Sequence, residues 1–524
     1  MALLRLLAAH TTRLTSIFLL VTVALALHAV FARRGFGKRR RGVPLPPGPP
    51  GKPILGHLRI IPTENPEYAY ATWSKQYKSD VLYFNVLGQD VVVLNSVRAA
   101  VDLLDRRGAN YCDRPRFVLF EEMGWRKTLT FLRWGSDFRM HRSVLQKSFS
   151  RTNIVAYREL QQREALTLVK GIMRDPGSWE TALRRFATAV VMSIGFGVDV
   201  ESDDDTYIQI ATDASYALGH GGAPAGTLAD FFPLLKHLPN WLVRDRSLKF
   251  ARDWKWAIRQ LHDVPYAAVT AQKNPKQSLV KVMLDLRKQQ VSTGSPELSV
   301  DDIKGAAGAV YAAGQDTTWS TLIVFVLCMV LHPEVQEKAQ RLIDEIVGDT
   351  RLPTFEDRPR LPYIDYIVQE TLRWCPVSPI GVPHRSLEDD VYNGMFIPKG
   401  SIVYANARAM THDVNLYSDP ERFDPDRYAP IEQGGRGEPF PVGHFGFGRR
   451  LCVGQHLAEA NVWIVVASIF SKVQIGRALG PLGEEVIPKV ELTNGLTSYP
   501  KPFPCRFSRR TPNTIKSSMA HELK

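Results

Sequence analysis

The chain has 524 residues, 44% of them hydrophobic, a size that suits one large domain or several average ones. The formal net charge is +13, but residues 1–42 hold eight arginines and lysines and no acidic residue, so the excess belongs mainly to the N-terminus and predicts no nucleic-acid partner. The five cysteines are scattered and odd in number, so they indicate neither a disulfide framework nor a paired-cysteine metal site.

The first predicted element is a membrane anchor within residues 1–32. Residues 14–32 carry no charge, and as an α-helix they would span about 28 Å, enough for the thin bilayer of the endoplasmic reticulum. Six basic residues follow within ten positions, against two before, so the positive-inside rule places the rest of the chain in the cytosol. A cleaved signal peptide is the alternative interpretation; we favour a retained, single-pass anchor.

A basic and proline-rich linker is predicted for residues 33–53. Residues 44–53 favour an extended polyproline conformation, which would hold the following domain at a fixed pose above the membrane. We assign residues 54–510 to one folded domain and residues 511–524 to a disordered tail.

The domain begins with a predicted hairpin, in which strands at residues 81–85 and 91–95 flank a turn at residues 88–90. Ser96 then caps a short helix that runs to Leu104. Residues 113–124 have no regular pattern and are predicted to form a loop. A further helix begins near Phe138, carries Arg142 and runs toward Phe149.

Residues 155–300 are predicted to be mainly amphipathic helix. Within them, residues 231–242 form an apolar stretch that two prolines interrupt. Two interpretations remain open for this stretch: ordinary core, or a segment that dips into the bilayer beside a substrate entrance.

A long helix is predicted to begin after Ser299 and to end before Pro333. Residues 306–331 are almost free of charge, so this helix should be buried on all sides. Asp316 is the exception, and an isolated acid in an apolar helix is costly unless it is paired or used. Gly314 and Thr317 weaken the helical ladder, which predicts a notch in the helix.

Glu370 and Arg373 are three residues apart on a predicted helix over residues 364–374, the spacing of a helical ion pair. The apolar residues 377–382 follow and lead to His384, whose ordinary interpretation is a surface histidine. Residues 420–428 (PERFDPDRY) then precede a glycine-rich loop.

That loop, residues 445–454, presents one cysteine, Cys452, just before a predicted helix over residues 453–472. A helix N-terminus favours a thiolate. Gly448 and Gly454 permit a close approach of the backbone, and Arg450 could pair with an anionic group. One thiolate, a close-fitting backbone and a nearby cation together match the needs of a haem.

The loop fills every fixed position of the Phe-x-x-Gly-x-Arg-x-Cys-x-Gly signature and thereby resembles the cytochrome P450 superfamily, the haem-thiolate monooxygenases. Residues 313–318, the Glu370–Arg373 pair and residues 420–423 resemble three further motifs in the family's order. The likeness covers about residues 44–510, and residues 231–242 and 502–507 resemble fungal members of secondary metabolism. The resemblance implies a mainly α fold with small β-sheets, behind an N-terminal transmembrane helix.

The resemblance also implies a cofactor, heme b (iron-protoporphyrin IX), and roles for the motif residues. Cys452 would be the axial iron ligand, and Asp316 and Thr317 would deliver protons during oxygen activation. Phe138 replaces the family's tryptophan, which puts one propionate contact in doubt. The implied haem contacts are Phe445, Gly446, Arg450, His384 and Arg142, and the implied structural network is Glu370, Arg373 and Arg422.

The function implied is the insertion of one oxygen atom from O2 into an apolar small molecule, by hydroxylation of a terpenoid, polyketide or indole. No flavin or nicotinamide fingerprint is present, so the electrons would come from NADPH through a separate NADPH–cytochrome P450 reductase, with cytochrome b5 as a second candidate partner. Arg449 would dock an acidic partner. Two alternatives remain: a reductase-independent haem-thiolate isomerase or dehydratase, and a membrane-bound haem carrier or sensor.

Overall fold

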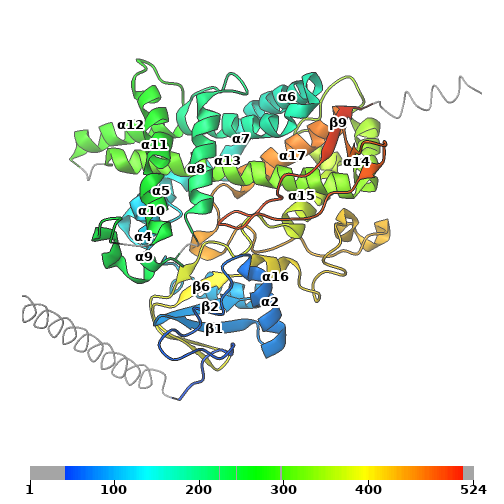
Figure 1. Ribbon diagram of the computed structural model, residues 1–524. Helices are drawn as coiled ribbons and strands as arrows, with labels where there is room; N and C mark the ends of the chain where they lie inside the picture. The colour runs from blue at the N-terminus through cyan, green and yellow to red at the C-terminus, as the bar shows by residue number, and fades with distance from the viewer. Residues whose placement is uncertain (1–41, 223–224, 243–244, 295–297, 511–524) are drawn as a thin grey trace, which may run out of the picture.

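One long helix, α13 (Val300–Leu331), crosses the middle of the molecule, and most other helices pack around it (Figure 1). The computed structural model describes residues 42–222, 225–242, 245–294 and 298–510. The predicted anchor (1–32) and tail (511–524) lie outside the described residues. The Ser299 hydroxyl accepts from the Asp302 N–H at 3.1 Å and completes a capping box, which confirms the predicted start of α13.

The helices around α13 are the expected amphipathic ones. The partners in direct contact with it are α5 (Ser136–Ser148), α7 (Trp179–Phe196), α8 (Thr206–His220), α11 (Lys255–Thr270), α12 (Leu279–Thr293), α14 (Pro333–Ile346), α15 (Pro362–Trp374) and α17 (Gln455–Lys472). Among the described residues α13 is the helix long and apolar enough to cross a membrane, but most of it is buried in the protein. It is therefore a core helix.

Gly314 sets how closely α13 approaches α7. A Cβ at this position would lie 2.6 Å from a methyl carbon of Val191, far inside van der Waals contact. The helix is nevertheless continuous from Val300 to Leu331. Gly314 thus serves close helix packing, and the helix runs through this position without interruption.

The remaining helices lie at the edges of this bundle. They are α2 (Pro66–Tyr77), α3 (Val97–Ala100), α4 (Val118–Met123), α6 (Arg158–Arg174), α9 (Leu228–Phe231), α10 (Arg246–Asp253) and α16 (Ala407–Thr411). Helix α4 forms inside the predicted loop at residues 113–124. Its Leu119 N–H donates to the Asp230 carboxylate at 3.3 Å, a contact from 111 residues away that local sequence does not reveal.

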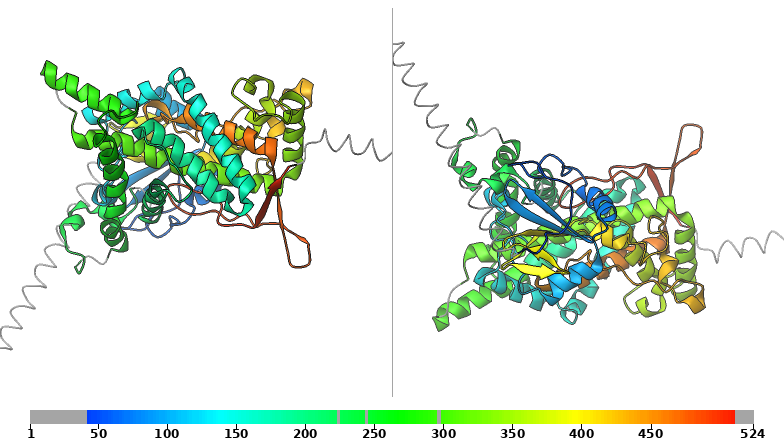
Figure 2. Two further views of the ribbon diagram at one scale, coloured as in Figure 1. Left: turned by 90° about the horizontal axis from the view of Figure 1, so that it is seen from above. Right: turned by 90° about the horizontal axis from the view of Figure 1, so that it is seen from below.

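Three small β-sheets complete the fold, as predicted, and the largest lies with α2 and α16 at one end of the molecule (Figure 1). Its order is β1 (Val81–Val86), β2 (Gln89–Leu94), β6 (Ile402–Ala405), β3 (His384–Arg385), with β2 and β6 parallel. The second sheet pairs β4 (Asp390–Tyr392) with β5 (Met395–Ile397). The third has the order β8 (Glu485–Val486), β7 (Val473–Leu479), β9 (Cys505–Arg509), and its β7–β8 hairpin projects from the body (Figure 2).

The predicted hairpin of β1 and β2 is confirmed, with a turn that begins one residue earlier and a second strand that begins two residues earlier than expected. Val86 pairs with Gln89, so Leu87 and Gly88 form a two-residue turn. Their φ angles are 51° and 89°, the left-handed conformation of the turn type that matches strand twist.

The proline-rich residues 44–53 pack against the sheet. The Tyr83 N–H of β1 donates to the Pro47 carbonyl at 3.1 Å, and the Phe396 N–H of β5 donates to the Pro44 carbonyl at 2.7 Å. A His57 ring nitrogen hydrogen-bonds the Pro49 carbonyl at 2.8 Å. The folded unit therefore begins before residue 54, because the chain covers the outer edge of β1.

Candidate functional site

The cysteine loop folds back on itself to present Cys452. The Cys452 N–H donates to the Phe445 carbonyl at 2.9 Å, which closes the loop ahead of α17. Gly446 and Gly448 have φ angles of 80° and 52°, and a Cβ on Gly448 would collide with the Leu104 carbonyl. Gly448 is thus required by backbone conformation and by a close approach, and Gly446 by backbone conformation.

The Cys452 thiol lies among groups that oppose each other. Cys452 is exposed, but desolvation by the surrounding protein still raises its pKa, while the N–H groups of Gly454 and Gln455 and the charge of Arg142 lower it. The Arg142 guanidinium donates to the Leu451 carbonyl at 2.5 Å, beside the thiol. A bound metal ion would deprotonate such a thiol, and the flanking N–H groups would stabilise the thiolate.

Two buried arginines meet beside this loop. Arg450 donates to the carbonyls of Cys112 and Leu132 at 2.7 and 2.9 Å, and its guanidinium lies 3.7 Å from the centre of the Phe138 ring. Arg114 donates to the Pro383 carbonyl at 2.8 Å. Burial lowers the pKa of Arg450 to about 10, and it lowers the pKa of Arg114, with Arg450 as a second cause.

His384 adjoins the same pair. One ring nitrogen, Nδ1, hydrogen-bonds the Tyr111 carbonyl at 2.8 Å, so Nδ1 carries the proton and Nε2 can donate only in the doubly protonated ring. Burial lowers the pKa of His384, followed by the charge of Arg114 and that of Arg450. Nε2 of His384 could therefore donate to a propionate, as predicted, only if the negative charge of that propionate stabilised the doubly protonated ring.

This cluster fits a ligand with carboxylates. Nη2 of Arg450 and Nε of Arg114 are buried and have no hydrogen-bond partner among the described residues. The nearby acid, Asp113, is already bound by Arg133 at 2.9 Å and by the Trp134 N–H at 2.8 Å. Buried N–H groups without partners are costly, and haem propionates beside Cys452 would satisfy them.

The segment of α13 that carries Thr317 faces the cysteine loop. Thr317, Thr318 and Thr321 line one cavity together with His444 and Phe445. The Thr317 hydroxyl donates to the Ala313 carbonyl at 2.8 Å. Ala313 is exposed and Thr317 half-exposed on a helix that is otherwise almost wholly buried. The two motifs, far apart in sequence, therefore border the same interior space.

Asp316 lies on another side of α13. Its carboxylate accepts from the Thr497 hydroxyl at 2.9 Å, and burial raises its pKa against the effects of Thr497, Ser215 and Arg184. A raised pKa keeps a proton on the acid in a wider pH range, which suits a proton donor.

The predicted structural network exists, with one correction. Both side chains of the Glu370–Arg373 pair are fully buried and lie 2.8 Å apart. The third member is Arg427, whose guanidinium binds Glu370 at 3.0 Å. The predicted member, Arg422, is exposed and contributes only its carbonyl, which accepts from Arg373 at 3.1 Å.

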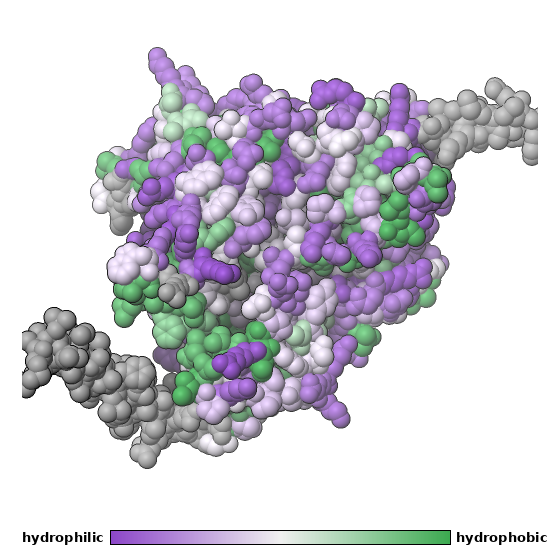
Figure 3. Space-filling model, viewed as in Figure 1, coloured by the Kyte–Doolittle hydropathy of each residue, from purple (hydrophilic) through white to green (hydrophobic). Residues whose placement is uncertain are grey.

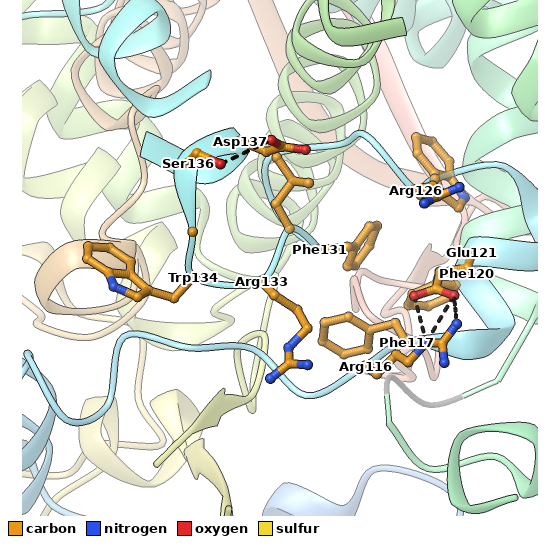
Figure 4. A pocket seen from close by; sticks show the side chains of 13 residues that line it. Arg116, Phe117, Phe120, Glu121, Arg126, Phe131, Arg133, Trp134, Ser136 and Asp137 are labelled. Carbon is orange, nitrogen blue, oxygen red and sulfur yellow. Dashed lines mark hydrogen bonds and ion pairs between the residues drawn. The ribbon is translucent and has the colours of Figure 1, made fainter. Parts of the chain in front are cut away.

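A second cavity, of about 280 Å³, opens between α4 and the start of α5 (Figure 4). Three of its lining aromatic rings, Phe117, Phe120 and Phe131, pack against one another with centroids 4.7–6.0 Å apart. Leu132 also lines it and accepts from Arg450, so this cavity adjoins the arginine pair. None of the residues predicted for catalysis lines it.

Three contributors escaped the sequence analysis: Arg114, Arg427 and Thr497. Arg114 follows Asp113 in a segment predicted only as loop. Arg427 lies in the stretch 424–428, which resembles the family but was not expected to supply the ion pair. No local signal marks Thr497.

Comparison with known proteins gives a consistent picture. The cytochrome P450 family profile matches residues 46–476. The chain is 36% identical over 499 residues to a cytochrome P450 monooxygenase of Armillaria gallica, covering 94% of this chain and 97% of the relative. It is 34% identical over 513 residues to tryptamine 4-monooxygenase of Psilocybe cyanescens, covering 96% and 99%. A zebrafish cytochrome P450 structure with abiraterone shares the fold, with a TM-score of 0.69, 23% identity, and coverage of 85% and 100%.

Proposed function

Because the chain belongs to the cytochrome P450 family and is a monooxygenase with a thiolate-ligated haem, we propose that it inserts one oxygen atom from O2 into an apolar small molecule. Cys452 is the proposed iron ligand. The observation that carries the proposal is the cavity in which Thr317 of α13 meets Phe445 of the cysteine loop.

The proposed haem contacts follow from the unpaired groups. Arg450 and Arg114 would bind the propionates, with His384 beside them, and Phe445 and Gly446 would lie against the macrocycle near the sulfur. Arg142, which lies at the thiol, would stabilise the thiolate rather than serve only the propionates. When bound, the haem supplies the oxygen-activating chemistry.

Asp316 and Thr317 are the proposed proton-handling residues. Burial raises the pKa of the Asp316 carboxyl, and the Thr317 hydroxyl faces the cavity shared with the cysteine loop. The Thr317 hydroxyl must leave the Ala313 carbonyl to pass a proton into the cavity, and rotation about one side-chain bond achieves this.

Surface composition supports a membrane-bound enzyme with an apolar substrate. Among residues 231–242, Leu234 is 80% exposed and Trp241 is 81% exposed, which favours the membrane interpretation of this stretch over ordinary core. Hydrophobic side chains gather on the face that carries α9 and the β1 end of the sheet (Figure 3). We propose that this face rests on the endoplasmic reticulum membrane, with the domain in the cytosol.

The proposed electron donor is NADPH–cytochrome P450 reductase, with cytochrome b5 as a possible second donor. Arg449 and Arg139 are exposed, and their guanidinium groups lie 5.1 and 5.8 Å from the Trp134 ring, beside the cysteine loop. An acidic partner surface would find complementary charge there. Among substrates, indoles gain support from the likeness to tryptamine 4-monooxygenase, and terpenoids and polyketides remain candidates.

Membranes that contain the protein and a reductase test the proposal directly. With NADPH and a panel of indoles, terpenoids and polyketides, we expect a product heavier by one oxygen atom. Cys452→Ser should abolish both the product and the red-shifted Soret band of the reduced carbon monoxide complex. Cys505→Ser, on β9, is the matched control and should retain both. A thiolate-type band that persists in Cys452→Ser would contradict the assignment.

A further inference from the structure

Three elements surround the Asp316 carboxylate. The Thr497 hydroxyl, from the loop at residues 492–500, donates to its Oδ2 at 2.9 Å. Ser215 of α8 hydrogen-bonds the carboxylate and also contacts the Gln315 amide oxygen at 3.4 Å. Arg184 of α7 contributes a charge and lies 3.6 Å from the centre of the Trp319 ring. The acid of α13 is thus held mainly by hydroxyl groups, and Arg184 acts on it through its charge.

The loop that supplies Thr497 is fixed at both sides of that residue. The Ser498 N–H donates to the Val377 carbonyl at 2.8 Å, and the Ser378 hydroxyl donates to the Leu496 carbonyl at 3.3 Å. Leu492 and Pro500 form a β-bridge that closes the loop. The Thr497 hydroxyl is therefore presented to Asp316 by a rigid backbone, and its position does not depend on a mobile side chain alone.

We propose that Thr497 is a positioning residue for the proton donor: its hydroxyl holds the Asp316 carboxylate toward the C-terminal loop and α8. The proposal rests on the proposed function, because it assigns a geometry to the acid that handles protons there. A carboxylate bound by Thr497 is turned away from the Thr317 hydroxyl, which hydrogen-bonds Ala313 instead. Motion of the C-terminal loop or of α8 would consequently change which way the proton donor faces.

The sign of the expected effect follows from the surroundings. Burial raises the pKa of Asp316, and the bonds from Thr497 and Ser215 oppose this by stabilising the charged form. The charged or titratable groups around it are Arg184, with Glu180 3.8 Å beyond it on α7, and Tyr499 of the C-terminal loop. Removal of the Thr497 hydroxyl removes a stabilising bond, so the pKa must rise further.

The decisive variant is Thr497→Val, which keeps the side-chain shape and removes the hydroxyl. Oxygen insertion that depends on protonated Asp316 declines as pH rises through its pKa. In Thr497→Val the decline should move upward by roughly one to two pH units, the size of one lost hydrogen bond to a charged group. Thr497→Ser keeps the hydroxyl and should restore the wild-type profile.

The matched control is Thr167→Val on α6, whose hydroxyl bonds only the Arg163 carbonyl of its own helix, at 3.1 Å. This variant should leave the pH profile unchanged. A second measurement does not need turnover: the infrared carbonyl stretch of protonated Asp316, assigned by its loss in Asp316→Asn, should shift to higher frequency in Thr497→Val.

Two outcomes separate this proposal from the proposed function. If Thr497→Val keeps the wild-type pH profile and carbonyl stretch while its reduced carbon monoxide spectrum is normal, the positioning role is wrong. If the wild-type protein itself lacks the thiolate-type spectrum, the proposed function fails. The infrared comparison then still decides whether Thr497 holds the Asp316 carboxyl, because it requires only the folded chain.

Discussion

Two groups of buried arginines differ in the partners that they bind, and this difference separates structure from ligand binding. Arg373 and Arg427 converge on Glu370, which also accepts from the Tyr428 hydroxyl at 2.8 Å. Every charge in that group is answered within the protein. Arg114 and Arg450 have only carbonyl partners, and each leaves a buried N–H group without one among the described residues.

The lesson is that burial of an arginine does not by itself identify its role. A buried cation with a protein carboxylate fixes the fold, and breaking such a pair is strongly destabilising. A buried cation with unpaired donors lowers the stability of the ligand-free chain and marks the place where an anionic ligand is expected. The following predictions test this contrast, beginning with the largest effect.

Arg427→Met should break the closed network and lower the free energy of unfolding by about 3–5 kcal/mol, because it leaves the Glu370 carboxylate buried without one of its cations. Urea unfolding followed by tryptophan fluorescence measures this loss. The control is Arg422→Met, which removes an exposed side chain and should cost under about 0.5 kcal/mol. Equal losses in the two variants would restore Arg422 to the network.

Arg450→Met and Arg114→Met should weaken haem binding and leave the stability of the haem-free protein unchanged or higher. Each should speed haem loss by roughly tenfold or more, because one charge-assisted hydrogen bond to a propionate disappears. The haem-free protein should unfold at the same or a higher urea concentration, since an unpaired buried charge is removed. Transfer of haem to an acceptor apoprotein gives the rate. If the haem-free forms of these variants were destabilised as strongly as the Arg427 variant, Arg114 and Arg450 would have a structural role like that of Arg427, and the contrast would be wrong.

Asp302 extends the contrast to the acids of α13. Lys127 lies 2.9 Å and His141 3.2 Å from its carboxylate, and despite burial these partners and Ser299 lower its pKa to about 2. A folded pKa below the unfolded value of 3.8 stabilises the protein above pH 4, and the stabilisation disappears as pH falls through about 2.

Asp302→Asn should therefore cost about 1 kcal/mol at neutral pH, after allowance for partial solvent screening. Unfolding measured from neutral pH downward should show wild type and variant converging as the pH falls below 4. A gap that stays constant over this interval would show that the capping geometry, and not the charge, carries the effect.

Arg449 should show the smallest effect, because it is exposed and its charge is screened by salt. Arg449→Gln should raise the reductase concentration for half-maximal turnover by about two- to fivefold at low salt, with little change at high salt. Titration of reductase at two ionic strengths measures this, and Arg506→Gln on β9 is a distant exposed control. An equal effect at both salt concentrations would point to a contact other than charge.

Local signals predicted the local structure well. Ser299 and Asp302 form the capping box that marks the start of α13. Leu87 and Gly88 form the hairpin turn, and the strand after it begins only two residues earlier than predicted. The cysteine loop was predictable for the same reason, because its glycines are needed for the local backbone conformation and for close backbone contact. Pattern and chemistry coincide in these short segments, so the sequence alone is sufficient.

Partner choice over long distances was not predictable. The Thr497 hydroxyl reaches Asp316 across 181 positions, and Arg114 reaches Pro383 across 269. Arg422 and Arg427 lie five residues apart on an irregular segment, where no helical or strand period tells which side chain turns inward. The packing role of Gly314 was not predictable for a related reason, because the methyl group that requires a glycine there belongs to α7.

The prolines at residues 44–53 have a practical consequence for anyone who trims the protein for purification. They cover the edge of the outermost strand. A truncation after Pro53 would remove the carbonyl acceptors of the Tyr83 and Phe396 N–H groups and expose an unpaired β-strand edge. The truncated protein would aggregate through this edge even if its active site were intact. A truncation just before Pro44 would keep this edge covered.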